Sequence, residues 1–98
     1  MSLIEIQRAD RRLLMLRALA EEPDYSLSDI VLRGLVAEFG HDVPLDTVRA
    51  DLDWLARAGL VTTGEAGSAV VATITSRGAD VAAGRVRIEG VRRPRPGE

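Results

Sequence analysis

The sequence predicts a mainly α-helical domain with one small β-hairpin, an α+β fold with the element order α-α-α-β-β-α. Apolar residues recur at helical spacing through residues 3–55, and from residue 60 the pattern changes to period two and is rich in Val, Thr and Ile. A chain of 98 residues can bury one modest core but not two. We therefore expect one domain over residues 1–84 and a C-terminal tail over residues 85–98.

The first helix is predicted from Leu3 to Ala20, because this stretch contains no Gly or Pro and Pro23 prevents its continuation. Its second half is apolar on more than one face. Either the helix is central and buried by its own domain, or part of it forms a dimer contact. The candidate dimer residues are Leu3, Leu14, Met15 and Ala18.

The second and third helices are separated by a short connection, His41–Pro44. Ser26 or Ser28 is the expected N-cap of the second helix, and Gly40 the expected stop. The apolar positions of the second helix are Leu27, Ile30, Val31, Leu35, Val36 and Phe39. Those of the third helix, which begins near Pro44, are Leu45, Val48, Leu52 and Leu55.

The hairpin is predicted from two strands, Leu60–Thr63 and Ala69–Thr75, joined by the segment GEAGS. Thr75 or Ser76 then caps a short fourth helix that ends before Gly84. Two prolines in RVRIEGVRRPRPGE indicate an extended, mobile tail, although Val86, Ile88 and Val91 can hold its first part against the domain.

This element order is that of a winged helix-turn-helix. The tight connection between Phe39 and Leu45 lets the third helix cross the second at a large angle, so that one helix faces outward.

Two segments strengthen this interpretation. DTVRADLDWLARAGLV resembles the third helix and wing entry of bacterial winged-helix regulators, and TITSRGADVAAG is similar to the start of the helix after their wing. Over nearly its full length the chain resembles small proteins of Mu-like phages and prophages, often labelled ArsR-like, that end in a Gly-Val-basic-basic-Pro-x-Pro tail. The resemblance implies a phage or prophage origin and a winged-helix fold.

Metal sensing and catalysis are not expected. ArsR-type sensors bind metal through Cys or His, and this chain has no Cys and a single histidine, His41, which is better explained as a polar turn residue or a C-cap donor. No nucleophile has a positioned base and no Gly-rich phosphate loop is present, so we predict no enzyme and no cofactor. The mixed N-terminus, without a long apolar run, predicts a cytoplasmic protein without a membrane segment. The resemblance to phage proteins implies that this cytoplasm is that of a bacterial host.

The third helix is the first candidate for DNA contact. Its apolar stripe leaves a second set of side chains facing outward, namely Asp46, Thr47, Arg49, Ala50, Asp53 and Arg57. Arg49 is the best candidate for a guanine or phosphate contact, with Thr47 and Arg57 beside it. Alternatively, Arg49–Asp53 and Asp53–Arg57 are solvated i,i+4 pairs. The wing offers only Glu65, so phosphate contacts must come from elsewhere.

Arginine is unevenly distributed along the chain. Residues 1–76 carry a balance of −5 and residues 77–98 one of +3. The first helix offers Arg8, Arg11, Arg12 and Arg17, and the C-terminal part offers Arg77, Arg85, Arg87, Arg92, Arg93 and Arg95. The tail is interpreted as a basic arm on DNA, or else as a solubilising end or a docking peptide for a protein partner.

Trp54 is expected to be partly buried in the core or at a dimer seam.

The leading hypothesis is a phage-derived homodimer that binds double-stranded DNA in transcription or another phage DNA transaction. The alternative is an interaction module of the same fold that binds a phage protein in packaging or assembly and has little affinity for DNA.

Overall fold

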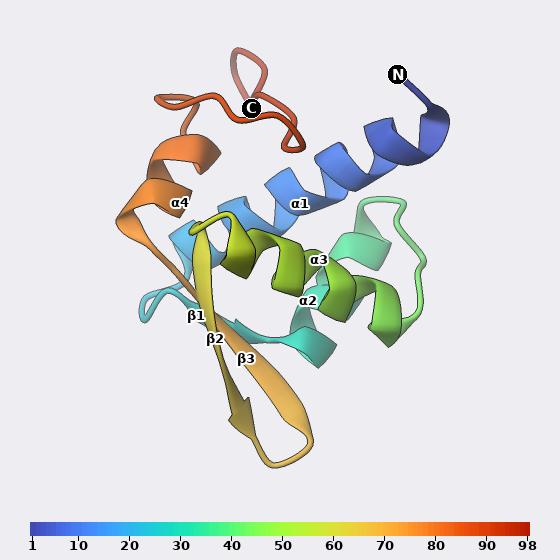
Figure 1. Ribbon diagram of the computed structural model, residues 1–98, viewed down its shortest axis with the longest axis vertical. Helices are drawn as coiled ribbons and strands as arrows, with labels where there is room; N and C mark the ends of the chain where they lie inside the picture. The colour runs from blue at the N-terminus through green and yellow to red at the C-terminus, as the bar shows by residue number, and fades with distance from the viewer.

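The computed structural model describes residues 1–98 as four α-helices and a three-stranded antiparallel sheet (Figure 1). The helices are α1 (Leu3–Glu21), α2 (Asp29–Glu38), α3 (Leu45–Arg57) and α4 (Ser76–Ala82). The strands are β1 (Ser26–Ser28), β2 (Val61–Ala66) and β3 (Ala69–Ile74). The predicted α+β class is confirmed. No helix is long and apolar enough to cross a bilayer.

A single core holds the elements together. Its 13 buried residues include side chains from every helix and from β2 and β3, so the hydrophobic effect links all of these elements in one cluster. Met15, Leu16 and Leu19 of α1 are fully buried at its centre. Each such side chain contributes roughly 1.5–3 kcal/mol to folding.

Strand β1 is not predicted from the sequence. Leu27 pairs with Ala72 of β3, and the sheet has the order β1-β3-β2. The assignment of Leu27 to the second helix is therefore wrong. Three residues are too few for an alternating pattern to be recognised, and the serines suggest a helix start equally well. Ser28 is indeed the N-cap of α2, because its Oγ accepts a hydrogen bond from the Val31 N–H at 3.2 Å.

The buried face of helix α2 matches the predicted apolar positions only in part, since Val36 is buried and Leu35 packs against the core as predicted. Leu32 and Val36 are fully buried, whereas Ile30, Val31 and Phe39 are more than half exposed. The prediction fails for these three residues because α2 is apolar on several sides, so its periodicity does not select a face. The buried face consists of Asp29, Leu32 and Val36, and the last two belong to the common core.

The β2–β3 hairpin is longer than predicted. Pairing runs from Val61–Ile74 to Ala66–Ala69, so most of the expected GEAGS loop belongs to β2. Only a tight turn remains, with Gly67 at φ 63°. Thr75 is the N-cap of α4 as predicted, and its Oγ1 accepts the Gly78 N–H at 3.0 Å. The hairpin projects from the body of the molecule (Figure 1).

Candidate nucleic-acid interface

The outward face of α3 is largely the predicted one. Val48, Leu52 and Leu55 are buried on the opposite face. The predicted outward side chains divide into exposed ones, namely Asp46, Ala50, Asp53 and Arg57, and half-buried ones, namely Thr47 and Arg49. The two best candidates for DNA contact are therefore the two that the protein partly covers.

Arg49 lies where α3 meets the start of α2 and the hairpin turn. Its Nε donates to Oδ2 of Asp29 at 2.7 Å, and its Nη2 donates to the carbonyl of Ser68 at 2.9 Å. We call this group the Asp29–Arg49–Ser68 clasp. The predicted Arg49–Asp53 pair is not formed, because Arg49 is directed to the buried carboxylate instead. The Arg49 side chain still keeps 39% of its surface exposed.

Asp29 is fully buried at the first position of α2. Burial raises the pKa of Asp29, but hydrogen bonds from Arg49 and from the backbone N–H groups of Val70 and Ile30 outweigh it and lower the pKa below its ordinary value. Asp29 is therefore ionised at neutral pH, and it balances the charge of Arg49.

The remaining charges near α3 do not favour phosphate. Arg57 forms the predicted i,i+4 pair with Asp53 at 3.1 Å, and both side chains are largely exposed. Asp46 and Glu65 are exposed without a cationic partner. No arginine on α3 is free of a carboxylate, so this surface has little positive charge to offer a duplex.

Two arginines of α1 are internal rather than available to DNA. Arg11 and Arg12 both donate to Asp51 of α3, which is buried between the two helices. Arg12 also lies 4.0 Å above the ring of Trp54, in a cation–π contact. The expectation that these two arginines serve as phosphate contacts is wrong. The expected partial burial of Trp54 is confirmed.

The C-terminal strap, residues 85–98, folds back over α1 (Figure 1). The Arg92 N–H donates to the Ala9 carbonyl at 3.1 Å, and the Arg92 guanidinium binds Asp10 at 2.7 Å and Glu98 at 2.6 Å. The predicted attachment through Val86, Ile88 and Val91 is confirmed, since all three pack against the core. The tail does not extend away from the domain.

The strap and the hairpin turn lie at opposite ends of the molecule, whose long axis measures 37 Å (Figure 1). Arg92 is held by Asp10 and Glu98, and Arg85 binds Asp80 at 2.8 Å. The other arginines predicted in this part are exposed and have no carboxylate partner, namely Arg77, Arg87, Arg93 and Arg95. The structure thus does not bring the strap arginines together with Arg49.

The four candidate dimer residues do not form one surface. Met15 is fully buried in its own chain and cannot contact a partner, so its assignment to a dimer face is wrong. Leu14 and Ala18 line a hollow of about 430 Å³ together with Leu35 and Phe39 of α2. Leu3 is exposed at the start of α1, outside this hollow.

The groups that sequence reasoning missed are three carboxylates, of Asp10, Asp29 and Asp51. Asp10 accepts from Arg92 and bonds Nε2 of His41 at 2.7 Å, so the lone histidine joins the network below the strap. Burial raises the pKa of Asp10, but the hydrogen bonds from His41 and Arg92 outweigh it and lower the pKa. No pattern of spacing identifies these acids, because their partners come from other elements.

Comparison with known proteins gives a phage relative. The chain is 44% identical over 92 residues to the uncharacterized protein gp26 of Escherichia phage Mu, covering 94% of this chain and 95% of that protein. It is 37% identical over 62 residues to an uncharacterized protein of Haemophilus influenzae, covering 63% of this chain and 60% of that protein. No family model and no solved structure matches. The match to gp26 spans almost the whole of both chains, and the protein therefore belongs to the family of phage Mu gp26.

Proposed function

We propose that this protein is a winged-helix DNA-binding protein of a Mu-like phage or prophage. In this proposal α2 and α3 form the helix-turn-helix and the β2–β3 hairpin forms the wing. The element order and the short connection between α2 and α3 support it. So does the surface position of α3 beside the projecting hairpin (Figure 1).

The observation that carries the proposal is the position of Arg49. It stands in the first half of α3, where a recognition helix comes closest to base edges. Two hydrogen bonds fix its guanidinium at the junction of helix and hairpin, while much of the side chain remains exposed. A guanidinium held in this way loses little entropy when it meets a phosphate or a guanine.

The charge of the surface limits the affinity. Because Arg49 and Arg57 are the only arginines on α3 and each is already paired with a carboxylate, we expect at most about two neutralised phosphates per protomer. The slope of log affinity against log salt should then be no steeper than about −2. This weak binding per protomer is sufficient for a transcription factor, or for an accessory protein of a DNA transaction, when two protomers bind the DNA together.

A homodimer is part of the proposal, and its surface is the hollow whose apolar lining is Leu14, Ala18, Leu35 and Phe39. Charged residues also line this hollow, namely Asp10, Arg17, Glu21, Arg92 and Glu98. Phe39 exposes 63% of its surface beside this apolar floor. A two-fold arrangement would place Phe39 of each copy against the floor of the other, an isologous contact.

Fluorescence anisotropy with a random duplex at about 50 mM and about 200 mM salt tests DNA binding. Ala50→Glu adds a negative charge to the exposed face of α3 without touching the clasp, and should weaken binding about tenfold. Ala37→Glu makes the same change at an exposed position of α2 and should leave the affinity within about twofold. Equal effects of the two substitutions, or no binding at low salt, would refute the proposal.

A second candidate is a protein-interaction module in phage packaging or assembly. Ile30 and Val31 favour it, because both are more than half exposed on α2, and large apolar side chains grouped on a surface often mark protein contacts. This module would show no duplex binding at about 50 mM salt, which separates it from the first candidate.

A further inference from the structure

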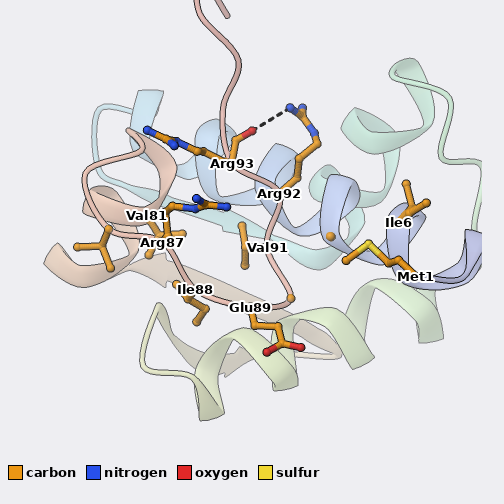
Figure 2. A pocket seen from close by; sticks show the side chains of 12 residues that line it. Met1, Ile6, Val81, Arg87, Ile88, Glu89, Val91, Arg92 and Arg93 are labelled. Atoms are coloured by element: carbon orange, nitrogen blue, oxygen red, sulfur yellow. Dashed lines mark hydrogen bonds between the residues drawn. The ribbon is translucent and has the colours of Figure 1, made fainter.

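A second apolar groove lies between the first half of α1 and the C-terminal strap (Figure 2). Its volume is about 470 Å³. The floor is formed by small and branched apolar side chains from α1, α4 and the strap, namely Ile6, Ala9, Val81, Val86, Ile88 and Val91. Figure 2 shows Met1 and Ile6 together at one side of the hollow.

The apolar surface continues beyond the groove along α1. Residues 1–8 are all exposed, and Leu3, Ile4 and Ile6 expose 69%, 60% and 48% of their surfaces. At 100° per residue these three side chains span an arc of about 160°, with Glu5 and Arg8 on the other side, so the start of α1 presents a broad and uncovered apolar face. Its start is nevertheless well formed, because Ser2 Oγ accepts the Glu5 N–H at 3.1 Å.

The charges that line the groove are predominantly basic. Arg87, Arg92 and Arg93 line it, against Glu89 as the single acid. Arg92 is balanced by Asp10 and Glu98, whereas Arg87 and Arg93 are exposed without a carboxylate partner. An apolar floor beside unpaired guanidinium groups is complementary to a ligand that is both apolar and acidic.

We propose that this groove binds an amphipathic segment of a second protein, with an apolar face flanked by Asp or Glu side chains. A nucleic acid fits less well, since no aromatic side chain lines the groove to stack on a base. The strap, which supplies most of the residues that line the groove, lies at the opposite end of the molecule from the hairpin (Figure 1), so the inference does not depend on DNA binding by α3.

The probe is a synthetic helical peptide of about 18 residues with a leucine face and glutamate flanks. Matched peptides carry lysine in place of glutamate, or serine in place of leucine. Each is titrated into the isotope-labelled full chain, and the backbone amide signals of the strap and of α1 are followed by NMR. The Leu/Glu peptide should shift the signals of Gly90 and Ile6 and bind at least about tenfold more tightly than either matched peptide.

Variants then localise the contact. Arg87→Glu with Arg93→Glu should weaken binding of the Leu/Glu peptide at least about tenfold. The matched control, Arg33→Glu with Arg77→Glu, changes two exposed arginines that lie outside the groove and should leave the affinity within about twofold. Ile6→Ser should weaken binding through the apolar floor without changing any charge.

Three results would overturn the inference. Equal binding of the Leu/Lys peptide would remove the role of the basic side chains. A single-stranded oligonucleotide that displaces the Leu/Glu peptide at lower concentration would identify the groove as a nucleic-acid site. Sedimentation showing a dimer that Ile6→Ser dissociates, while Phe39→Ser does not, would assign the groove to a second copy of this chain.

Discussion

Three carboxylates, of the buried Asp29 and Asp51 and of the partly exposed Asp10, each receive at least one arginine from a distant part of the chain. Asp29 links α2 to α3 and the hairpin turn, Asp51 links α3 to α1, and Asp10 links α1 to the strap. At the two buried sites, of Asp29 and Asp51, an ionised carboxylate that loses its partner is costly, because water does not solvate it. The arginines at these sites are therefore structural whatever else they bind.

The clasp at Arg49 can be tested by its effect on stability. Arg49→Ala leaves the fully buried Asp29 without its cation, and we expect the free energy of unfolding to fall by about 3–5 kcal/mol. Arg57→Ala removes only an exposed i,i+4 pair and should cost less than about 0.5 kcal/mol. Urea denaturation followed by circular dichroism measures both.

The difference in unfolding free energy between wild type and Arg49→Ala depends on pH in a direction that follows from the pKa of Asp29. The pKa of Asp29 is lowered in the folded protein, so the contribution of the clasp is complete above the ordinary aspartate value of 3.8 and is lost as pH falls through the lower folded value. The gap between wild type and Arg49→Ala should accordingly narrow in acid. Similar costs for the two substitutions at neutral pH would contradict the structural role of the clasp.

At this scale the sequence identifies Arg49 but not its partner. Asp29 is 20 residues away, and the Arg11–Asp51 and Asp10–Arg92 pairs span 40 and 82 residues. Periodicity on a helix finds only neighbours such as Asp53 and Arg57. The sequence therefore shows how many charged residues α3 carries. It does not show which of the α3 arginines is paired with a buried carboxylate.

Among the elements, the junction of β2, β3 and α4 depends on close backbone approach. Thr75 caps α4 and also donates through its Oγ1 to the Gly59 carbonyl at 2.8 Å, while its N–H donates to the Leu60 carbonyl at 3.0 Å. A Cβ at Gly78 would lie 2.0 Å from the Leu60 carbonyl oxygen and 2.8 Å from Ile74. Only glycine lets α4 begin there.

Two glycine substitutions separate packing from helix propensity. Gly78→Ala should destabilise the protein by at least about 1–3 kcal/mol, because backbone has to move to admit the methyl group. Gly34→Ala, at an exposed position of α2 with nothing within 4 Å, should stabilise it by about 0.4–1 kcal/mol. Thermal unfolding then gives midpoints that move in opposite directions. Midpoints that move together would contradict the close approach at Gly78.

The elements themselves were the most predictable part of the structure. Caps such as Thr75 and stops such as Gly40 are local signals, and the structure confirms both. Strand β1 and the buried face of α2 are not predictable in this way because each depends on tertiary contacts, of β1 with β3 and of Leu32 and Val36 with the common core. A three-residue strand has no period of its own to detect.

For the whole molecule, ion pairing decides where positive charge is available. Seven of the 13 basic residues pair with a carboxylate, namely Arg11, Arg12, Arg17, Arg49, Arg57, Arg85 and Arg92. Of the six without a partner, three lie on the strap, and none lies on α3 or the hairpin. The distribution of free charge therefore differs from the distribution of arginine along the sequence.

The strap is fastened to α1 through Arg92, and the charges around Arg92 make this attachment sensitive to acid. Hydrogen bonds from Arg92 and from the Arg95 N–H lower the pKa of Glu98 to about 2, from an ordinary value of 4.5. Because the folded pKa is depressed, the contribution of Glu98 is complete above pH 4.5 and is lost as pH falls through about 2. The lowered pKa of Asp10 acts in the same direction.

We therefore expect the strap to stay docked above pH 4.5 and to loosen as pH approaches 2, which the fluorescence of Trp54, packed below Gly90, should report. Arg92→Gln removes the shared cation and should move this transition to higher pH. Arg93→Gln, the neighbouring arginine without a carboxylate partner, should leave it in place. If both variants keep the wild-type transition, the apolar contacts of Val86, Ile88 and Val91 hold the strap without help from its charges.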